Sequence, residues 1–273
     1  MMKRKEGSTH HSWVQRLSFL RAVMSTLFAN PTEGIDRLRN RAALWRDRRR
    51  DHSPLGYEPD PAWDSKLHAA LSLPWPCADH AGFEHLWSVL EDSLSSDLEL
   101  GWGHDADFAL AQAAWCLIRH LRPERVVETG VARGITSRVV LEAMKLDAKG
   151  HLWSIDLPPM REGWRQQAGL AVPKTLRGQW TLLRGSSKRL LPSVAARVGT
   201  LDMFIHDSLH TSSNMTFELE TAWSILRPGG ALLVDDIGLN AAFASFVRNR
   251  GVNRWVVAKH RDKADLFGVA IKE

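Results

Sequence analysis

The sequence from about residue 105 alternates short β-prone runs with helix-length segments. Five of these runs are apolar enough to be covered on both faces: "ERVVETG", "HLWSID", "QWTLLRG", "LDMFIHD" and "ALLVDD". This alternation predicts a mainly parallel sheet between two layers of helices. Only "RDKA" separates the last two runs, "RWVVAKH" and "DLFGVAI", and a parallel crossover needs a dozen or more residues. We therefore predict an α/β fold with a doubly wound, mostly parallel seven-stranded sheet that ends in an antiparallel hairpin.

Charge divides the 273 residues unevenly. Residues 1–52 contain 12 Lys and Arg against 5 Asp and Glu, whereas residues 53–110 contain 11 acidic residues and only Lys66 as a base. We predict a basic helical arm (1–52), an acidic connector or cap (53–104) and the α/β domain (105–273). Two interpretations of the arm stay open. It either folds onto the acidic segment or presents a solvated helical face, or it binds an anionic partner such as lipid head groups, a nucleic acid or a phosphorylated substrate.

Two helices are expected within the arm. The first has apolar residues at three- and four-residue steps, namely Trp13, Leu17, Leu20, Met24, Leu27 and Phe28. In the second, Asn30 can cap the helix, Pro31 suits its first position and Glu33 completes a capping-box-like start. Its apolar stripe is Ile35, Leu38, Ala42 and Trp45. The Pro-rich stretch from 53 to about 80 predicts a connector with little regular structure.

Several classes of protein are excluded or disfavoured. The most apolar run, "FALAQAAWCLI", is about half of the roughly 20 residues needed to cross a bilayer. Arg21 splits the apolar part of the N-terminal region, which argues against a signal peptide. Cys77 and Cys116 fit neither a disulfide framework nor a zinc-ligand spacing, so we interpret them as packed thiols in a reducing compartment. A cytoplasmic protein is expected, with peripheral membrane contact through the arm left open.

A ligand site is predicted where the first strand ends. In open α/β sheets, ligands bind beyond the carboxyl ends of the strands, near the point where strand order reverses. "VVETGVARGITS" places Glu128 at the end of the first run, followed by Gly130, Ala132 and Gly134 at alternate positions. Small residues there let a ligand approach the backbone, and the following helix start offers free N–H groups. The spacing does not fit a dinucleotide-binding fingerprint.

This motif resembles the first motif of class I S-adenosylmethionine-dependent methyltransferases, with Ala132 in place of the middle glycine. The resemblance extends over about 105–273 and includes the terminal hairpin, so it implies a Rossmann-like fold. It implies that Glu128 and the small residues of the loop contact S-adenosylmethionine. Asp156, at the end of "SIDLPP", would bind the two ribose hydroxyls of the cofactor, and Ser186 and Ser187 would lie beside its adenine.

Acidic residues follow the fourth and fifth predicted strands. "FIHDSLHT" contains Asp207, and "ALLVDD" ends in Asp235 and Asp236. If the two strands are neighbours, about 4.8 Å apart, three carboxylates converge at one edge of the sheet. Their mutual repulsion would raise their pKa values unless a cation is bound. An all-oxygen site of this kind suits Mg²⁺ or Mn²⁺ better than zinc.

The segment "HDSLHT" followed by a helix, "LRPGG" and "LLVDD" is similar to metal-dependent O-methyltransferases, and most closely to the macrocin-type and mycinamicin-type sugar methyltransferases. The resemblance implies Asp207, Asp235 and Asp236 as metal ligands and His210 as the base, with Asp207 thus part of the catalytic set. His206 is expected to have an architectural role. The implied acceptor is a hydroxyl of a sugar or small glycosylated metabolite, and a homo-oligomer is compatible with the sequence.

Two alternatives remain. One is a metal-independent methyltransferase with a different small-molecule or nucleic-acid acceptor. "DSLH" stands where amino-group methylating enzymes have an Asn-Pro-Pro-aromatic motif, which disfavours methylation of nucleic-acid bases. The other is a non-catalytic, S-adenosylmethionine-binding regulatory protein, against which the set of Asp207, His210, Asp235 and Asp236 argues.

Overall fold

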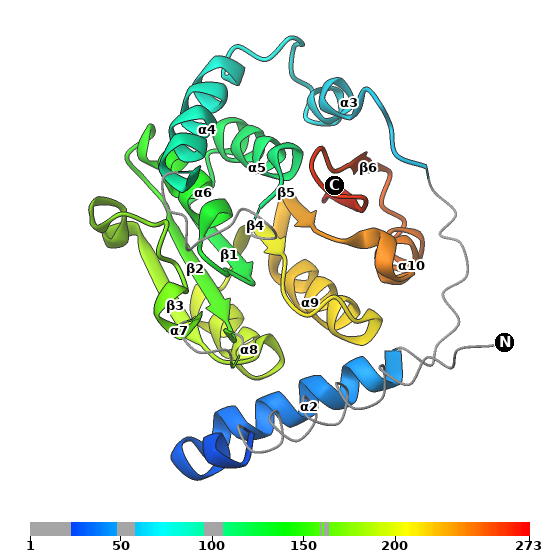
Figure 1. Cartoon of the computed structure of the whole chain (residues 1–273). Helices are drawn as coiled ribbons and strands as arrows, with labels where there is room; N and C mark the ends of the chain where they lie inside the picture. The colour runs from blue at the N-terminus through cyan, green and yellow to red at the C-terminus, as the bar shows by residue number, and fades with distance from the viewer. Residues whose placement is uncertain (1–22, 48–57, 96–105, 159, 161–163) are drawn as a thin grey trace, which may run out of the picture.

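A single seven-stranded sheet organises the computed structural model (Figure 1), which describes residues 23–47, 58–95, 106–158, 160 and 164–273. The strand order is β3-β2-β1-β4-β5-β7-β6. The strands are β1 (Arg125–Thr129), β2 (His151–Asp156), β3 (Trp180–Arg184), β4 (Leu201–His206), β5 (Leu226–Val234), β6 (Arg254–Lys259) and β7 (Leu266–Ile271). Strands β1 to β5 pair in parallel, and β7 pairs antiparallel with both β5 and β6. The predicted α/β fold with its C-terminal hairpin is confirmed.

Helices cover both faces of the sheet because successive strand residues alternate between two apolar clusters. Val126 contributes to one cluster and Val127 to the other. The first cluster includes side chains of α4 (His80–Ser95), α5 (Phe108–Leu121) and α6 (Ile135–Lys145). The second includes α8 (Ser187–Val198), α9 (Ser212–Ile225) and α10 (Ala242–Arg250). Short elements α7 (Trp164–Gln167), η2 (Lys174–Gln179) and η3 (Ile237–Leu239) lie in the connections.

The strand order reverses between β1 and β4. These two strands pair in parallel. Strand β2 is the other neighbour of β1, and β5 is the other neighbour of β4. The loops after β1 and β4 therefore diverge to opposite faces of the sheet. A crevice at this point is the expected ligand site of a doubly wound sheet.

The connector is more regular than predicted. The stretch from 53 to about 80 was expected to have little regular structure, yet α3 (Trp63–Ala70) lies within it and α4 begins at its end. Leu67 of α3 is fully buried and belongs to the first apolar cluster. The prolines of this stretch flank α3 and do not interrupt it, so the helix forms where the sequence between them is free of breakers.

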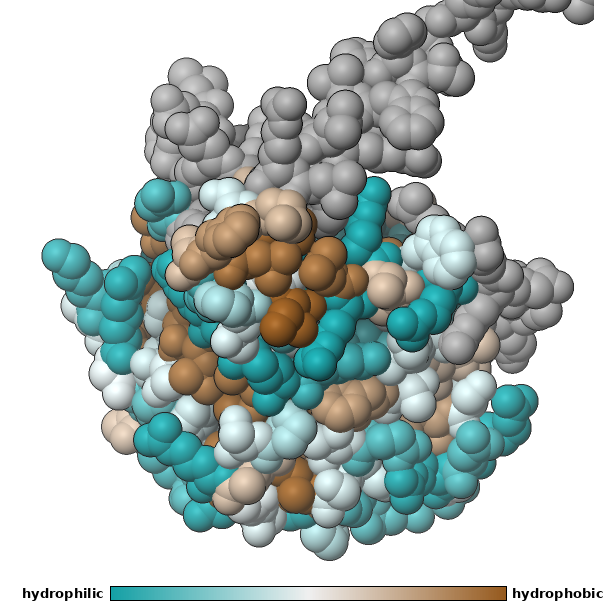
Figure 2. Space-filling model, turned by 90° about the horizontal axis from the view of Figure 1, so that it is seen from below, coloured by the Kyte–Doolittle hydropathy of each residue, from teal (hydrophilic) through white to brown (hydrophobic). Residues whose placement is uncertain are grey.

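Helix α2 (Pro31–Asp47) begins as predicted and packs through its polar face. The N–H of Glu33 donates to Asn30 Oδ1 at 3.2 Å, which caps the helix. The predicted apolar stripe points to solvent, since Ile35, Leu38 and Trp45 are 43%, 42% and 55% exposed. Figure 2 looks onto this side of the molecule and shows hydrophobic residues among hydrophilic ones. Polar contacts instead determine how α2 docks.

Those contacts come from the polar face of α2. Asp36, which is buried, accepts hydrogen bonds from the Ser186 backbone N–H at 3.1 Å and from Arg189 Nε at 2.8 Å. Asp47 accepts one from the Ser212 N–H at 3.1 Å. Two carboxylates of α2 thus meet the N-termini of α8 and α9, where free N–H groups and the helix dipole favour negative charge.

The first arm helix was predicted over residues that lie largely outside the described part of the chain. Among the described helices, none is long and apolar enough to cross a membrane.

Candidate active site

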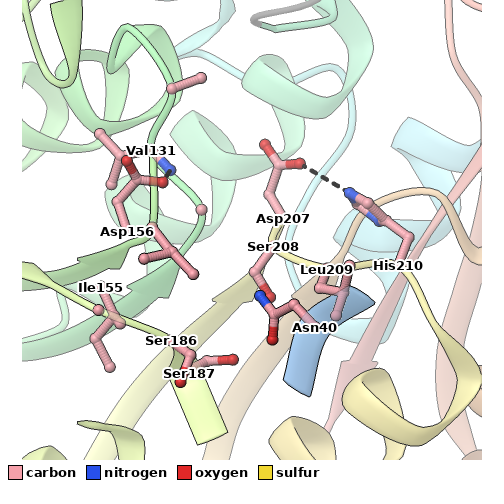
Figure 3. Close-up of a pocket in the computed structure, with 14 residues that line it drawn as sticks. Asn40, Val131, Ile155, Asp156, Ser186, Ser187, Asp207, Ser208, Leu209 and His210 are labelled. Carbon is pink, nitrogen blue, oxygen red and sulfur yellow. Dashed lines mark hydrogen bonds and ion pairs between the residues drawn. The ribbon is translucent and has the colours of Figure 1, made fainter. Parts of the chain in front are cut away.

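A cavity of about 360 Å³ opens at the carboxyl ends of β1, β2, β3 and β4, within the range of small-molecule sites. Each strand contributes the loop that follows it, and α2 contributes Asn40 (Figure 3). In Figure 3, Asp156 faces the cavity from one side and Asp207 and His210 lie across from it. Of the predicted site residues, the cavity is lined by Gly130, Ala132, Asp156, Ser186, Ser187, Asp207 and His210.

The loop after β1 depends on Gly130. Its φ is +83°, and a Cβ there would lie 1.7 Å from the carbonyl oxygen of Asp207. The N–H of Gly130 also donates to the Ile155 carbonyl at 2.9 Å. The glycine therefore lets the β1 and β4 loops touch, which brings the two predicted sites together. Gly134 precedes α6 with a φ of +85° and does not line the cavity.

Asp156 lines the cavity and is only partly satisfied by hydrogen bonds. Its Oδ1 accepts a hydrogen bond from the Val131 N–H at 3.3 Å, and the residue is buried. Its Oδ2 has no hydrogen-bond partner among the described residues. Burial raises the pKa of this carboxyl. A buried acceptor without a partner is costly, so the geometry fits a carboxylate that awaits a hydroxyl-bearing ligand.

Glu128 lies behind the loop and does not line the cavity. The hydroxyls of Ser137 and Ser154 each donate to Glu128 Oε2 at 2.6 Å. Burial raises the pKa of Glu128 to about 7 although these two hydrogen bonds oppose the shift. In this position Glu128 ties β1 to β2 and α6, and its predicted contact with a cofactor stays a prediction.

Ser186 and Ser187 form the floor of the cavity at the start of α8. The Ser186 side chain makes no capping hydrogen bond, although the residue occupies the N-cap position. The Ser187 hydroxyl donates to Asn214 Oδ1 at 3.4 Å. With the Ser186 N–H bound to Asp36, this floor is built jointly by α8, α9 and α2.

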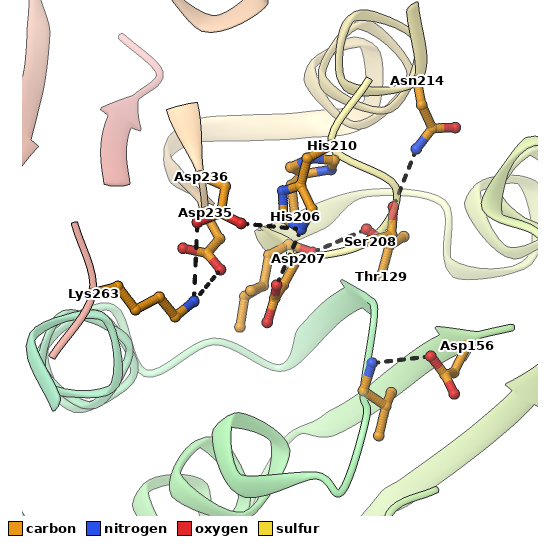
Figure 4. Close-up of polar contacts among 12 residues, drawn as sticks. Thr129, Asp156, His206, Asp207, Ser208, His210, Asn214, Asp235, Asp236 and Lys263 are labelled. Atoms are coloured by element: carbon orange, nitrogen blue, oxygen red, sulfur yellow. Dashed lines mark hydrogen bonds and ion pairs between the residues drawn. The ribbon is translucent and has the colours of Figure 1, made fainter. Parts of the chain in front are cut away.

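The three aspartates and His210 lie close together (Figure 4), and of these four residues Asp207 and His210 line the cavity. His210 Nε2 lies 3.6 Å from Asp207 Oδ1 and 3.6 Å from Asp236 Oδ2. Side-chain ligand atoms of Asp207, His210 and Asp235 all lie within 4.8 Å of one another. Asp236 adopts a left-handed φ of +50°. Strand β5 ends at Val234, and the left-handed backbone at Asp236 lets the two adjacent carboxylates reach one cluster.

The electrostatics of this cluster follow from burial and like charge. Burial and the neighbouring Asp235 raise the pKa of Asp207 well above its ordinary value. The same two causes raise the pKa of Asp236 to about 6. Burial and the proximity of His206 lower the pKa of His210 to about 4. Without a bound cation, His210 is therefore neutral at pH 7, and it is a weaker proton acceptor than an ordinary histidine.

Two basic residues that the sequence interpretation missed hold Asp235. His260 Nε2 lies 2.7 Å from Asp235 Oδ1, and Lys263 Nζ lies 3.2 Å from Asp235 Oδ2. His260 Nδ1 lies 3.1 Å from Asp107, whose carboxylate caps α5. Burial opposes protonation of His260, but its two carboxylate partners raise its pKa to about 9. The hairpin thereby fixes one carboxylate of the cluster.

Glu218 of α9 was also missed, and it positions the loop after β4. It is fully buried and binds His206 Nδ1 at 2.6 Å. It also accepts hydrogen bonds from Thr129, Ser208 and Asn214 at 2.5, 2.7 and 2.8 Å. His206 is thus held inside the protein, as expected for an architectural residue. A signal was present, because Glu218 stands in the apolar stripe of Met215, Leu219 and Ala222.

The comparisons with known proteins agree with this geometry. Residues 127–237 match the family model described as a methyltransferase domain. This range includes the β1 loop, Asp156, Asp207, His210 and the aspartate pair. A comparison with curated proteins found no match.

Solved O-methyltransferase structures share the fold. A provisionally assigned O-methyltransferase from Klebsiella pneumoniae has a TM-score of 0.54 at 18% identity, covering 77% of this chain and 96% of that one. The O-methyltransferase TomG from Streptomyces achromogenes, in complex with SAM, has a TM-score of 0.50 at 15% identity, covering 85% and 96%. An O-methyltransferase from Bacillus cereus, in complex with SAH, has a TM-score of 0.51 at 12% identity, covering 77% and 98%.

Residues 127–237 of the chain therefore resemble a methyltransferase domain. The sheet order and terminal hairpin form the Rossmann-like fold that these solved methyltransferase structures share.

Proposed function

We propose that the protein is an S-adenosylmethionine-dependent O-methyltransferase that methylates a hydroxyl of a sugar or small glycosylated metabolite, assisted by Mg²⁺ or Mn²⁺. One observation carries this proposal. The cavity joins the unpartnered carboxylate oxygen of Asp156 to the cluster of Asp207 and His210. The proposed cofactor-binding residue Asp156 and the proposed base His210 would thus line the same cavity.

For the cofactor, we propose that Asp156 binds the ribose hydroxyls and that Ser186 and Ser187 lie beside the adenine. Gly130 and Ala132 would let the cofactor approach the backbone of the β1 loop, while Glu128 and Gly134 would shape that loop from behind. The free Oδ2 of Asp156 supports this assignment, because a ribose hydroxyl would satisfy a buried acceptor.

For the metal, the proposed ligands are Asp207, Asp235 and Asp236. The cluster fits a hard cation, since the raised pKa of Asp207 reports carboxylates crowded together in a buried site. When bound, a divalent cation would lower the pKa of the acceptor hydroxyl. Asp235 would be pre-oriented for this role by His260.

For the chemistry, His210 would accept the proton of the hydroxyl at Nε2, the nitrogen that faces Asp207 and Asp236. Both carboxylates would stabilise the imidazolium that forms. Asp207 and Asp156 flank the cavity and would hold the acceptor and the cofactor in line. Such orientation can contribute on the order of 7 to 11 kcal/mol to lowering a barrier.

The proposal that the acceptor is a sugar or glycosylated metabolite rests on the sequence resemblance. The structural neighbours support O-methylation but not the sugar. TomG is described as involved in tomaymycin synthesis, and another neighbour is provisionally named a caffeoyl-CoA O-methyltransferase. Both are named O-methyltransferases, and we propose methylation of a hydroxyl of a small molecule for this chain.

A metal-independent methyltransferase is the second candidate, and one contact favours it. The Lys263 ammonium lies 3.2 Å from Asp235 and 4.0 Å from Asp236. A lysine in this place can partly neutralise the carboxylates without a divalent cation.

Methyl transfer from labelled S-adenosylmethionine to a panel of glycosides, polyols and catechols would separate the two candidates. We expect transfer to be lost on treatment with EDTA and restored by Mg²⁺. A Lys263→Met variant serves as the matched comparison, because it removes the competing cation and should increase the affinity for Mg²⁺. Transfer that is indifferent to EDTA would favour the metal-independent candidate.

We also keep the three-segment organisation (1–52, 53–104, 105–273), a cytoplasmic location and contact of the basic arm with anionic membranes as proposals. The exposed Ile35, Leu38 and Trp45 of α2 support the membrane contact. A chain lacking residues 1–22 keeps α2 at the cavity. Its binding to anionic and neutral vesicles, compared with that of the full chain, tests whether the basic arm adds an electrostatic attraction.

A further inference from the structure

The two cysteines of the chain lie beside two histidines, in two neighbouring groups that share His120. Cys77 Sγ lies 3.3 Å from His120 Nε2, and Cys116 Sγ lies 3.6 Å from His68 Nε2. The rings of His68 and His120 pack edge to face at 5.2 Å. Ligand atoms of His68, Cys116 and His120 lie within 4.8 Å of one another, and those of Cys77, Asp79 and His120 form a second such group. The sequence interpretation of two separately packed thiols missed this convergence.

We propose that His68, Cys77, Cys116 and His120 form a structural Zn²⁺ site. Two thiolates and two imidazoles are a common donor set of closed tetrahedral zinc sites. With Zn–S of about 2.3 Å and Zn–N of about 2.0–2.1 Å, the edge between a sulfur and a nitrogen ligand is about 3.6 Å. The two observed S···N distances, 3.3 and 3.6 Å, are close to that edge.

His68 is oriented as a zinc ligand. Its Nδ1 lies 2.7 Å from the backbone carbonyl oxygen of Asp64. Because a carbonyl oxygen only accepts hydrogen bonds, Nδ1 carries the proton and Nε2 presents its lone pair toward Cys116. A hydrogen bond from the second ring nitrogen to a carbonyl is the usual support of a metal-bound histidine.

The other ligands are also placed by local structure. Cys116 and His120 stand four residues apart on α5, so they share one face of that helix. Cys77 lies in the segment between α3 and α4. Asp79 is a poorer candidate, because Arg119 Nε binds its carboxylate at 3.2 Å.

The site is separate from the candidate active site. Asp107, which contacts His260, caps the start of α5, whereas Cys116 lies nine residues further along. At about 1.5 Å per residue this is about 14 Å along the helix axis. In Figure 1, α3 lies on the other side of the molecule from α2. A metal there would fasten α3 and the segment after it to α5, a role in stability and not in methyl transfer.

Cobalt titration tests the proposal, because thiolate-to-cobalt charge transfer can arise only from Cys77 and Cys116, the two cysteines of the chain. The full-length protein is reduced with a thiol-free phosphine, treated with chelator and titrated with Co²⁺. We expect one equivalent to produce a thiolate charge-transfer band together with the visible bands of tetrahedral cobalt. One equivalent of Zn²⁺ should abolish both and raise the thermal midpoint.

Variants then assign the ligands. Cys77→Ser and His120→Ala should each weaken cobalt binding at least tenfold and reduce the tetrahedral bands. His85→Ala, an exposed histidine of α4, and Asp207→Asn, at the separate acidic cluster, should leave the spectrum unchanged. Both partly exposed ligands are chosen for substitution so that the variants fold, which circular dichroism verifies.

Without a metal, the same contacts are S–H···N hydrogen bonds. In that case the reduced wild-type protein gives no thiolate charge-transfer band with excess Co²⁺, which would overturn the proposal. A band that persists unchanged in both Cys77→Ser and His120→Ala would overturn it as well, since cobalt would then bind Cys116 without the other ligands.

Discussion

Asp156 is the residue on which the cofactor assignment depends most. Its buried carboxylate has one oxygen bound to the Val131 N–H and the other without a partner among described residues. Hydrogen bonds to charged groups contribute about 1.5 to 3 kcal/mol each. Asp156→Ala should therefore weaken S-adenosylmethionine binding about 10- to 100-fold in calorimetric titrations. Glu84→Ala, at an exposed position of α4, is the control, and equal affinities for the two variants would contradict the assignment.

His210 is the proposed proton acceptor, and its role separates kinetically from binding. General bases contribute typically 10²- to 10⁴-fold to rate. His210→Ala should lower kcat by about that factor while the affinity for S-adenosylmethionine changes little, because Asp156 lies across the cavity. Steady-state kinetics with an acceptor found in the panel, together with calorimetry, measure both quantities. A loss of cofactor affinity as large as the loss of turnover would indicate a structural role instead.

From the sequence we predicted the candidate site residues at the ends of strands, but not those on helices or in the hairpin loop. Asp156, Asp207, Asp235 and Asp236 could be placed at one edge because the carboxyl ends of parallel strands share it. Asn40, Glu218 and Lys263 come from a helix, a helix and a hairpin loop, and no local pattern reports which cavity such elements approach. Asp236 reaches the cluster through its left-handed backbone, which residue type alone does not indicate.

At the scale of elements, α2 shows how a polar face can determine docking. Asp36 is buried and bound to the Ser186 N–H and Arg189. Asp36→Ala would leave the start of α8 without a charged acceptor. We expect the free energy of unfolding to fall by about 1.5 to 3 kcal/mol, measured by denaturant titration. Arg39→Ala, an exposed change on the same helix, should alter it by less than about 0.5 kcal/mol.

A result in which Asp36→Ala and Arg39→Ala are equally stable would contradict the docking of α2.

The order of helices and strands was well predicted for the sheet, because the alternation of strands and helices is a local signal in the sequence. The orientation of α2 was not, since amphipathic spacing indicates that one face differs from the other but not which one is buried. Helix α3 was missed because prolines flank it and drew the interpretation toward a connector.

The whole molecule should lose stability in acid through Glu218. Burial raises its pKa, but the ion pair with His206 and several hydrogen bonds outweigh burial and lower it to about 2. The ionised form is thus favoured in the folded state, so this contribution is complete above the unfolded pKa of about 4.5 and is lost as pH falls toward about 2. The contribution of the ionised Glu218 to the free energy of unfolding is about 3 kcal/mol.

Glu218→Gln provides the comparison. At pH 7 the wild type should have the larger free energy of unfolding, and the difference should shrink as pH falls from about 4.5 to about 2. Denaturant titrations at several pH values, followed by circular dichroism, measure this. A difference that stays constant over that interval would contradict an ionised Glu218 in the folded protein.

At the same scale, the architecture could be predicted because strand spacing limits the possible topologies, as the short "RDKA" connection does for the hairpin. Contacts between distant segments could not. Cys77 and Cys116 are 39 positions apart in the sequence, and their approach depends on how α3 and the segment after it pack on α5.

The most direct measurement is calorimetric titration of the full-length wild-type protein with S-adenosylmethionine and with its demethylated product. It needs neither an acceptor nor an identified metal. The account predicts saturable binding of one equivalent of each ligand, weakened by Asp156→Ala. Absence of binding by the folded wild-type protein, at ligand concentrations well above those of ordinary cofactor sites, would contradict it.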